Sequence, residues 1–314
     1  MKTILGLVVT FDPPEGFLSN LHMLSEELDF VLVIDNRSAA ETRRKLEDEL
    51  KRRPAKFKIV FNDENLGLGA ALNQGFQWAL SNGYHAVMTF DQDSRPAAGM
   101  IERLWQTYAS HPERERVAVV APGVVDGLSG ERIAYLRKRG HFFIGRVPCR
   151  EDRLEDVLYV IASGSLNTLS AYSGLGGFRD DFFVDYVDTE YCLRAGRQGY
   201  KIILDCGATL QHRLGEQQKK TIGPLTLRPT FHSPIRWYYI NRNRLVMYGL
   251  YLWKFPSWVV FDLMTAAYAF LKMLLYEDQK LRKTLAVLLG VWDGLLHRMG
   301  PISAGREAQI GSDK

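Results

Sequence analysis

The chain has 314 residues, of which 46% are hydrophobic and 24% charged. This composition is that of a globular protein and excludes disorder as the main state. The net charge of +4 gives no indication of a dedicated nucleic-acid binder. The charge is uneven, however. From His212 onward 15 Lys/Arg stand against 7 Asp/Glu, a net of +8, while the preceding residues have 25 against 29, a net of −4. A basic C-terminal part favours a surface for anionic lipid or an anionic acceptor, with a solvated basic face as the alternative.

The cysteines and the N-terminus indicate the compartment. Three cysteines without metal-type spacing fit a reducing cytoplasm better than a disulfide scaffold; they are Cys149, Cys192 and Cys206. The first apolar run has only seven residues and stops at Asp12-Pro13-Pro14, so it indicates a buried strand rather than a signal peptide. We therefore expect a cytoplasmic protein.

Short apolar runs alternate with helical patterns along the first 121 residues. Buried strands are expected at Ile4–Thr10, Phe30–Ile34, Lys58–Phe61, Ala86–Phe90 and Val117–Ala121. Helices are expected between them at 15–28, Glu41–Arg53, Gly69–Ser81 and Met100–Ser110. Such alternation with short links predicts an α/β fold, a mostly parallel sheet with helices on both faces.

Polar residues stand where the predicted strands end. They are Thr10, Phe11 and Asp12, then Asp35 and Asn36, then Asn62, and finally Asp91, Gln92 and Asp93. In open α/β sheets the ligand lies outside the carboxyl ends of the strands. We therefore expect these side chains to converge on one crevice.

The pattern changes in the rest of the chain. Residues 123–158 predict irregular or antiparallel structure, residues 159–212 are dense in Gly, aromatic and acidic residues, and residues 235–276 are rich in Trp, Tyr and Leu. The polar tail from Arg306 onward is expected to be frayed.

Asp91-Gln92-Asp93-Ser94 is the first chemical motif. Two carboxylates at i and i+2 on a turn can reach one Mg²⁺ or Mn²⁺, which prefers oxygen ligands and can bridge nucleotide phosphates. An isolated D-x-D is more often a polar turn, but its place beside other polar strand ends favours the metal interpretation. His212 is a candidate third ligand, with a structural histidine as the alternative.

Two further segments carry candidate groups. Asn65-Leu66-Gly67-Leu68-Gly69 and the helix after it, with Asn73 and Gly75, can bring the backbone close to an anion; for Gly69 and Gly75 close packing is the alternative. The run from Gly176 to Arg194 is crowded with acids and aromatics, and Asp188 begins a helical pattern that places Cys192 and Leu193 inward. Asp188 could accept a proton from an attacking hydroxyl, although at least one acid here is expected to cap the helix.

In this order the motifs resemble the inverting glycosyltransferases of family 2, with the GT-A fold, over roughly residues 4–215. The resemblance rests on Thr-Phe-Asp-Pro after the first strand, Asp35-Asn36, Asn65-x-Gly67, Asn73-x-Gly75, Asp91-x-Asp93-Ser94, Gly176-Gly177-Phe178, an acid near 188, and His212. It implies a nucleotide-sugar-binding half at 1–122, an acceptor-binding and catalytic half at 123–232, and a helical C-terminal extension at 233–314.

The resemblance also implies a role for each residue. Thr10 and Asp35 would hold the base and ribose, in a donor pocket that also includes Phe11, Asp12, Asn36 and Gln92. Asn65, Gly67 and Asn73 would line the nucleotide pocket. Asp91 would face the ribose and the metal, and Asp93 and His212 would bind Mg²⁺ or Mn²⁺. Asp188 matches the catalytic base, but Val187 stands where the family often has Glu, so Asp185 is the second choice and Glu190 also stays open.

Within the family, the chain is more similar to bacterial dTDP-rhamnosyltransferases. Phe90–Ser94, Tyr238–Arg244 and Gly290–Leu295 carry this likeness. It implies a dTDP-rhamnose donor and a saccharide or lipid-linked acceptor in the synthesis of surface polysaccharide such as O-antigen. A UDP-sugar donor, a non-catalytic nucleotide-sugar-binding scaffold and a nucleotidyltransferase are the alternatives; the last would need a basic Gly-rich loop where Asp12-Pro13-Pro14-Glu15 stands.

Residues 255–276 are apolar over nearly a membrane length but contain Asp262 and Lys272. Because a spanning helix would bury charge at appreciable cost, we expect helices that lie on a membrane, at the inner face of the cytoplasmic membrane, or that pack as a buried extension or dimer interface. The oligomeric state is left open.

Overall fold

The computed structural model describes residues 3–127, 129–139, 143–155, 157–212, 220–222, 225–227 and 231–311. The chain folds into two compact units. Unit 1 comprises Met1–Lys138, Gly145–Asp180 and Val187–Arg213, and unit 2 comprises Arg139–Ile144, Asp181–Tyr186 and Leu214–Lys314. The boundaries expected at 122/123 and 232/233 stay predictions.

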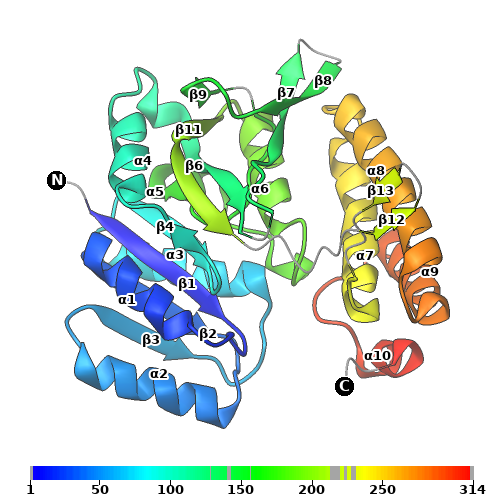
Figure 1. The fold of residues 1–314 in the computed structure, drawn as a ribbon, viewed down its shortest axis with the longest axis horizontal. Coiled ribbons are helices and arrows are strands. Elements are labelled where there is room, and N and C mark those ends of the chain that lie inside the picture. Colours follow the sequence, from blue (N-terminus) through cyan, green and yellow to red (C-terminus); the bar gives the residue numbers. More distant parts are fainter. Residues whose placement is uncertain are drawn as a thin grey trace. The chain divides into compact units, whose positions relative to one another are not determined.

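Unit 1 is built on one twisted sheet with the strand order β3-β2-β1-β4-β10-β6-β11-β5 (Figure 1). The strands are β1 Ile4–Thr10, β2 Phe30–Asp35, β3 Phe57–Phe61, β4 Ala86–Asp91, β5 Arg95–Pro96, β6 Val117–Asp126, β10 Leu166–Thr168 and β11 Lys201–His212. The pairs among β1 to β4 are parallel, as is β6 with β11, whereas β10 and β5 run antiparallel to their neighbours. The predicted α/β fold with a mostly parallel sheet is confirmed.

Helices cover both faces of this sheet. They are α1 Phe17–Glu27, α2 Ala40–Arg52, α3 Leu68–Ser81, α4 Met100–Ala109, α5 Leu169–Leu175 and α6 Val187–Arg197, with 3₁₀ turns η1 Arg114–Arg116 and η2 Asp180–Phe182. One core joins Ile4 and Val8 of β1 to apolar residues of α1, α2 and α4. On the other face Gly75 of α3 lies against Leu7, where a Cβ would come within 2.4 Å of that side chain. The helices therefore fix the sheet from both sides, as the alternation predicts.

The strand register brings the polar strand ends to one edge. Thr10 pairs with Asp35, Asp35 with Phe61, and Val9 with Asp91. Because these strands are parallel and adjacent, the residues that follow them leave the sheet side by side. The predicted convergence of Thr10, Asp35 and Asp91 at the carboxyl edge follows from this register.

The last long strand of unit 1 leads to His212. Residues 159–212 were described by composition alone, whereas β11 runs from Lys201 to His212 with an irregularity in its register between Asp205 and Thr209. The Asp205 carboxylate accepts hydrogen bonds from the backbone N–H groups of Gly207 and Ala208 at 2.9 and 3.2 Å, which stabilises this bulge. The strand therefore resumes and carries His212 to the same edge.

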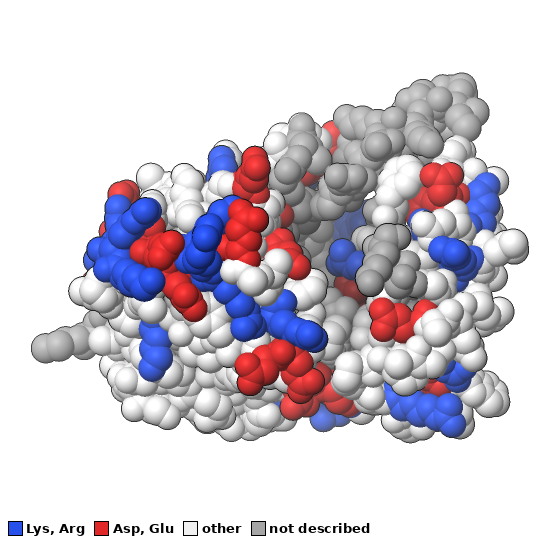
Figure 2. Space-filling view, turned by 90° about the horizontal axis from the view of Figure 1, so that it is seen from below, with Lys and Arg blue, Asp and Glu red and all other residues white. Residues whose placement is uncertain are grey.

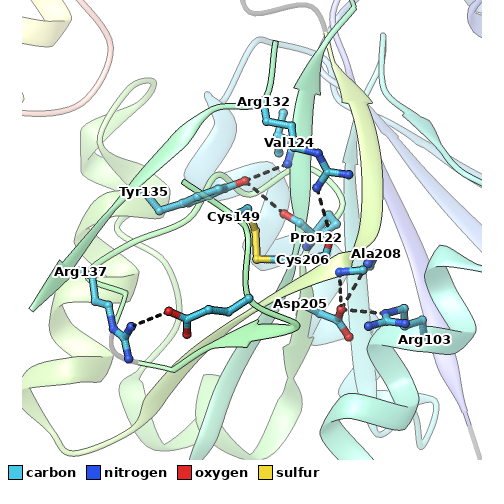
Figure 3. The surroundings of a disulfide bond; sticks show 12 residues. Arg103, Pro122, Val124, Arg132, Tyr135, Arg137, Cys149, Asp205, Cys206 and Ala208 are labelled. Atoms are coloured by element: carbon cyan, nitrogen blue, oxygen red, sulfur yellow. Dashed lines mark hydrogen bonds and ion pairs between the residues drawn. A yellow bond between two sulfur atoms is a disulfide. The ribbon is translucent and has the colours of Figure 1, made fainter. Parts of the chain in front are cut away.

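The segment expected to be irregular or antiparallel contains short strands. β7 Ala134–Arg139 and β8 Phe143–Pro148 form a two-stranded sheet, and β9 Arg153–Leu154 pairs antiparallel with β11. Cys149, which follows β8, is joined to Cys206 of β11 by a disulfide with a Cα–Cα distance of 5.3 Å (Figure 3). The expectation of unpaired cysteines is wrong for this pair, because residues 57 positions apart meet through antiparallel pairing that no local pattern reveals. Cys192 is free and buried.

Unit 2 is mainly helical in its described residues. It contains α7 Pro234–Tyr251, α8 Pro256–Tyr276, α9 Lys280–Leu295, α10 Ala304–Ile310 and the short strand pair β12 Lys220–Ile222 and β13 Leu225–Leu227. The predicted helical extension is confirmed. Ser233 caps α7 by accepting the backbone N–H of Arg236 at 3.2 Å, and Pro234 occupies the first turn.

Two glycines explain how α7 and α9 pack. A Cβ on Gly290 would lie 2.4 Å from the carbonyl oxygen of Tyr238, and one on Gly294 would lie 2.7 Å from that of Arg242. The two helices therefore approach backbone to backbone. Of the tail expected to be frayed, Arg306 to Ile310 instead belong to helix α10, where Arg306 pairs with the buried Asp293 of α9, and residues 312–314 lie outside the described residues.

The exposed faces of α2 and α8 differ in composition. Figure 2 shows the mixed Lys, Arg, Asp and Glu surface over α2. In contrast, α8 exposes large apolar side chains such as Leu263 and Met264. It is also the one helix within the described residues that is long and apolar enough to cross a membrane, judged by length and composition, and 17% of its apolar window is buried.

Candidate active site

Asp91, Asp93 and His212 form a three-residue cluster at the carboxyl edge of the sheet in unit 1. Each offers one ligand atom, and these atoms lie within 4.8 Å of one another. His212 Nε2 is 3.6 Å from Asp91 Oδ2, and its Nδ1 is 3.3 Å from Asp93 Oδ1. The structure therefore brings together the three residues predicted as metal ligands.

The pairing of β11 with β5 places His212 in this cluster. Leu210 pairs with Pro96 and Gln211 with Arg95, so His212 comes opposite Ser94. The Ser94 hydroxyl lies 3.0 Å from His212 Nδ1. An antiparallel contact between residues more than 100 positions apart thus sets the ring beside the D-x-D turn.

The two carboxylates change the protonation of His212. Burial lowers the pKa of the imidazole, but the hydrogen bond to Asp93 and the negative charges of Asp91 and Asp93 outweigh it, so the pKa lies above its ordinary value. The cluster is therefore a place where positive charge is favoured.

The donor set fits a divalent cation. Two carboxylate oxygens and one imidazole nitrogen suit Mn²⁺, and the oxygens also suit Mg²⁺. Ligand atoms within 4.8 Å of one another are close enough for one ion to contact all three groups after small side-chain rotations. These residues could hold the metal that the sequence predicts.

A segment that sequence reasoning missed supports the D-x-D turn. The Ser163 hydroxyl accepts the backbone N–H of Asp91 at 3.0 Å and lies 2.5 Å from the Ser94 hydroxyl. Gly164, with φ of +74°, donates its N–H to the carbonyl of Thr89 at 2.7 Å. The small residues Ser163-Gly164-Ser165 were the available signal, since a glycine between serines marks a tight approach to another chain segment.

The same segment reaches Asp188. The backbone N–H of Ala162 donates to Asp188 Oδ2 at 3.2 Å, so Ala162 and Ser163 connect the base candidate to the D-x-D turn. Asp188 stands in the first turn of α6 and accepts the Thr189 N–H at 2.7 Å. A carboxylate in a first helical turn is stabilised by the helix dipole. It also lines a small pocket with Thr89, Ala162 and Asn167.

The two other base candidates are tied in ion pairs. In unit 2 the Asp185 carboxylate accepts hydrogen bonds from Arg236 at 3.0 to 3.3 Å. Glu190 is buried in unit 1 and pairs with Arg194 at 2.9 Å. Each of these carboxylates would have to leave its arginine before it could accept a proton from an acceptor hydroxyl.

Asp185 lies in a segment with unusual backbone geometry. Phe183, Asp185 and Tyr186 have φ of +67°, +59° and +63°. The buried Asn243 amide of α7 donates to the carbonyls of Phe182 and Asp185, both at 3.0 Å, and to that of Val184 at 2.8 Å. The motif at 238–244 therefore holds this left-handed segment, which costs free energy without such support.

The predicted base and ribose residues form a buried network. Thr10 donates its hydroxyl to Asp35 Oδ2 at 3.1 Å, and Arg43 and the Ser38 N–H donate to Asp35 Oδ1, both at 3.1 Å. Asn36 donates to the Gly67 carbonyl at 3.0 Å. Thr10, Asp35 and Asn36 are therefore placed at the predicted edge but buried, and a direct contact with nucleotide stays a prediction.

Phe11, Asp12 and Gln92 are more accessible. Half of the Phe11 side chain is exposed (50%), and its backbone N–H donates to Gln92 Oε1 at 3.1 Å. Asp12 accepts the Ala39 N–H at 2.7 Å. An exposed aromatic ring beside polar strand ends is suited to stack on a flat base.

The Gly-rich segment is held mainly by internal contacts. Asn65 accepts the Gly67 N–H at 3.0 Å, and Asn73 both donates to the carbonyl and accepts from the N–H of Phe178 at 2.9 Å. A Cβ on Gly69 would lie 2.4 Å from the carbonyl oxygen of Arg179. The packing alternative thus describes Gly69 and Gly75, while pocket-lining by Asn65, Gly67 and Asn73 stays a prediction.

Comparison with known proteins defines the class of protein to which this arrangement belongs. The family model described as "Glycosyl transferase family 2" matches residues 15–157. The chain is 28% identical to the dTDP-rhamnosyl transferase RfbF of Shigella flexneri over 257 residues. This aligned region covers 78% of this chain and 80% of RfbF. The chain is a glycosyltransferase that transfers a sugar from a nucleotide-sugar donor, and its residues 15–157 are similar to glycosyltransferase family 2.

Solved structures share the fold. GalNAc-T7 with UDP, GalNAc and Mn²⁺ aligns with a TM-score of 0.59 and 14% identity, covering 79% of this chain and 48% of that one. Residues 1–349 of S. aureus TarS align with a TM-score of 0.58 and 12% identity, covering 95% of this chain and 82% of that one. The mannosyltransferase PcManGT from Pyrobaculum calidifontis, in complex with GDP-Man and Mn²⁺, aligns with a TM-score of 0.52 and 13% identity. The alignment covers 98% of this chain and 82% of that one. The chain thus spans about half of the GalNAc-T7 chain, and the GT-A fold is confirmed.

Proposed function

We propose that this chain is an inverting, metal-dependent rhamnosyltransferase that uses dTDP-rhamnose. The observation that carries the proposal is the grouping of Asp91, Asp93 and His212 within 4.8 Å, with Asp188 connected to it through Ala162 and Ser163. The donor sugar is supported by the 28% identity to the dTDP-rhamnosyl transferase RfbF of Shigella flexneri.

The residues divide the reaction between them. Asp188 accepts the proton of the acceptor hydroxyl while that oxygen forms a bond to the anomeric carbon. The bond from this carbon to the diphosphate breaks at the same time, and its electron pair leaves with the nucleoside diphosphate. A divalent cation bound by Asp91, Asp93 and His212 would stabilise the negative charge on that leaving group. A single displacement of this kind inverts the anomeric configuration.

Asp188 is the better candidate for the base than the acids around it. Asp185 and Glu190 are each paired with an arginine. Asp188 instead accepts backbone N–H groups and lines a pocket. Backbone donors therefore hold its carboxylate at the wall of a pocket, where an acceptor hydroxyl could reach it.

For the acceptor we propose a saccharide, free or lipid-linked, in bacterial surface polysaccharide synthesis. A cytoplasmic location at the inner face of the membrane would give access to both the nucleotide sugar and such an acceptor. The basic composition from His212 onward, 15 Lys/Arg against 7 Asp/Glu, supports an anionic acceptor or surface.

Calorimetric titration of the whole protein with dTDP-rhamnose, UDP-glucose and GDP-mannose tests the donor. We expect dTDP-rhamnose to bind at least tenfold more tightly than the others in Mn²⁺ or Mg²⁺, and binding to weaken at least tenfold in EDTA. Tighter binding of UDP-glucose would replace the rhamnosyl assignment by a UDP-sugar transferase. The absence of binding to all three donors with either metal would contradict the enzyme proposal and favour a scaffold.

The variant Asp93→Ala tests the metal role in the same titration, with Asp48→Ala as the matched control. Asp48 is an exposed aspartate on α2 that pairs with Lys51. We expect the metal-dependent part of donor binding to vanish in Asp93→Ala and to persist in Asp48→Ala. Equal loss in both variants would point to general damage to the protein.

A further inference from the structure

Helices α8 and α9 of unit 2 turn apolar side chains outward. On α8 exposed residues recur every three or four positions, at Val260, Met264, Tyr268, Leu271 and Leu275. Residues at this spacing share one face of a helix. A soluble helix normally presents polar residues on its outer face, as α2 does, so this face is unusual for a surface in contact with water.

The exposed side of α9 shows the same pattern. Leu281 is 88% exposed, and Leu285, Leu288, Trp292 and Leu295 are also exposed at helical spacing. We call the exposed apolar residues of α8 and α9 together the apolar stripes.

The carboxylates of this region point inward and are paired. Asp262 of α8 accepts hydrogen bonds from Arg244 Nε at 2.9 Å and from the Tyr248 hydroxyl at 2.8 Å. Glu277 pairs with Lys283 at 2.8 Å, and both side chains are buried. Within Pro256–Tyr276 and Lys280–Leu295, no Asp or Glu is exposed. The apolar stripes are therefore free of negative charge.

Cations and an indole border the apolar stripes. Trp253 is 93% exposed just before α8, beside the exposed Lys254. Lys280 and Arg282, also exposed, lie at the start of α9, against one exposed acid nearby, Asp278. Tryptophan and basic residues at the margin of an apolar face are typical of helices in the headgroup region of anionic membranes.

We propose that the apolar stripes of α8 and α9 dock the protein onto an anionic lipid bilayer, with their side chains entering the boundary of the acyl chains. A bilayer explains the charge pattern better than a second copy, because a second copy would present the same basic margin and repel it. Docking along the surface also keeps the Arg244–Asp262 pair out of the hydrocarbon, whereas a spanning α8 would have to bury it. This surface is independent of the donor that the enzyme uses.

Flotation of the whole protein with vesicles tests the proposal. The probes are phosphatidylcholine vesicles with and without about 30 mol% of the anionic lipid phosphatidylglycerol. We expect binding to the anionic vesicles, at least tenfold weaker binding in Met264→Glu/Leu271→Glu, and release at high pH. The matched control is Leu80→Glu, an exposed leucine on α3 of unit 1.

The basic margin is tested by Lys254→Ala/Lys280→Ala/Arg282→Ala against a control triple variant on α2, Lys45→Ala/Lys51→Ala/Arg52→Ala. We expect the first to weaken binding to anionic vesicles at least tenfold and the second to change it less than twofold. Each of three results would overturn the proposal: no binding to either vesicle, resistance to high pH (a spanning helix), or a stable dimer that Met264→Glu/Leu271→Glu dissociates.

Discussion

Two clusters built around aspartates, Asp293 with its donors in unit 2 and Asp91 with Asp93 in unit 1, illustrate how the same residue type can serve structure or chemistry. In unit 2 the buried Asp293 accepts two hydrogen bonds from Arg306, both at 2.9 Å, and one from the Tyr238 hydroxyl at 3.0 Å. In unit 1 Asp91 and Asp93 face each other across His212 within 4.8 Å. The first cluster matches each negative charge with donors, and the second concentrates negative charge.

The protonation of the two clusters follows from this difference. Burial raises the pKa of Asp293, but the hydrogen bonds from Arg306 and Tyr238 outweigh it and leave that pKa below its ordinary value. In the other cluster the histidine responds, with its pKa raised by Asp93 and Asp91 against the effect of burial. A carboxylate stabilised by its own partners holds the fold, whereas carboxylates that raise the pKa of a neighbour attract a cation.

Asp188→Asn should have the largest effect. Removing the proton acceptor is expected to lower turnover by about 10²- to 10⁴-fold, while affinity for dTDP stays within about twofold. Steady-state release of dTDP measures the first quantity and calorimetry the second. Asp185→Asn is the control, and a larger loss of turnover in that variant would move the base to Asp185.

Asp293→Ala should act on stability instead. Because it leaves the buried Tyr238 and the partly exposed Arg306 without their shared partner, we expect the free energy of unfolding to fall by about 1–3 kcal/mol. Chemical denaturation measures this, and turnover per folded molecule should stay within about twofold of the original. Asp93→Ala should show the reverse, with little change in unfolding and no metal-dependent activity. If both variants lost stability equally, the distinction between the clusters would be wrong.

His232 gives unit 2 a dependence on pH. Burial, followed by the nearby Arg236 guanidinium, lowers the pKa of this histidine to about 4. As the pH falls from about 6.5 to about 4, the unfolded chain binds a proton that the folded chain does not. The free energy of unfolding should therefore decrease over this window, by at most about 3 kcal/mol. In His232→Gln the free energy of unfolding, measured by denaturation at several pH values, should depend less on pH over this window. An unchanged pH dependence in that variant would contradict the role of His232.

Ser163→Ala should have the smallest effect. It removes the hydroxyl that accepts the Asp91 N–H and contacts Ser94, at a cost of about 1–2 kcal/mol in transition-state stabilisation. We expect about a tenfold loss of turnover in Mn²⁺ with a weaker apparent affinity for the metal. Ser129→Ala, which removes a hydroxyl bonded to Asp126, is the control. Full activity in Ser163→Ala would show that the turn keeps its shape unaided.

The sheet and the polar residues at its carboxyl edge were predictable because local patterns carry them, while metal binding by Asp91, Asp93 and His212 stays a prediction. Continuous apolar runs ending in polar residues mark strands buried on both faces, and the parallel register then places Thr10, Asp35 and Asp91 together without further information. Asp93 and His212 were also found, although the extension of β11 that brings His212 there depends on pairing with β5.

Long-range contacts account for what was missed. The Cys149–Cys206 disulfide, the support of the D-x-D turn by Ser163 and the stabilisation of residues 181–186 by Asn243 each join segments at least 57 residues apart. No periodicity in the sequence encodes such meetings. The helix at Ala304–Ile310 was missed for the same reason. In the sequence Arg306 resembles a solvent-exposed residue, and its partner Asp293 is brought beside it only by the fold.

The central claim is that Asp91, Asp93 and His212 hold the cation through which the donor diphosphate binds. The most direct test is titration of the protein with Mn²⁺ in the presence and absence of dTDP, for the original chain and for Asp93→Ala, with Asp293→Asn as a control from the other cluster. We expect one Mn²⁺ per chain, bound at least tenfold more tightly with dTDP present, in the original and in Asp293→Asn but not in Asp93→Ala. Mn²⁺ binding that is unchanged in Asp93→Ala, or unaffected by dTDP, would contradict the account.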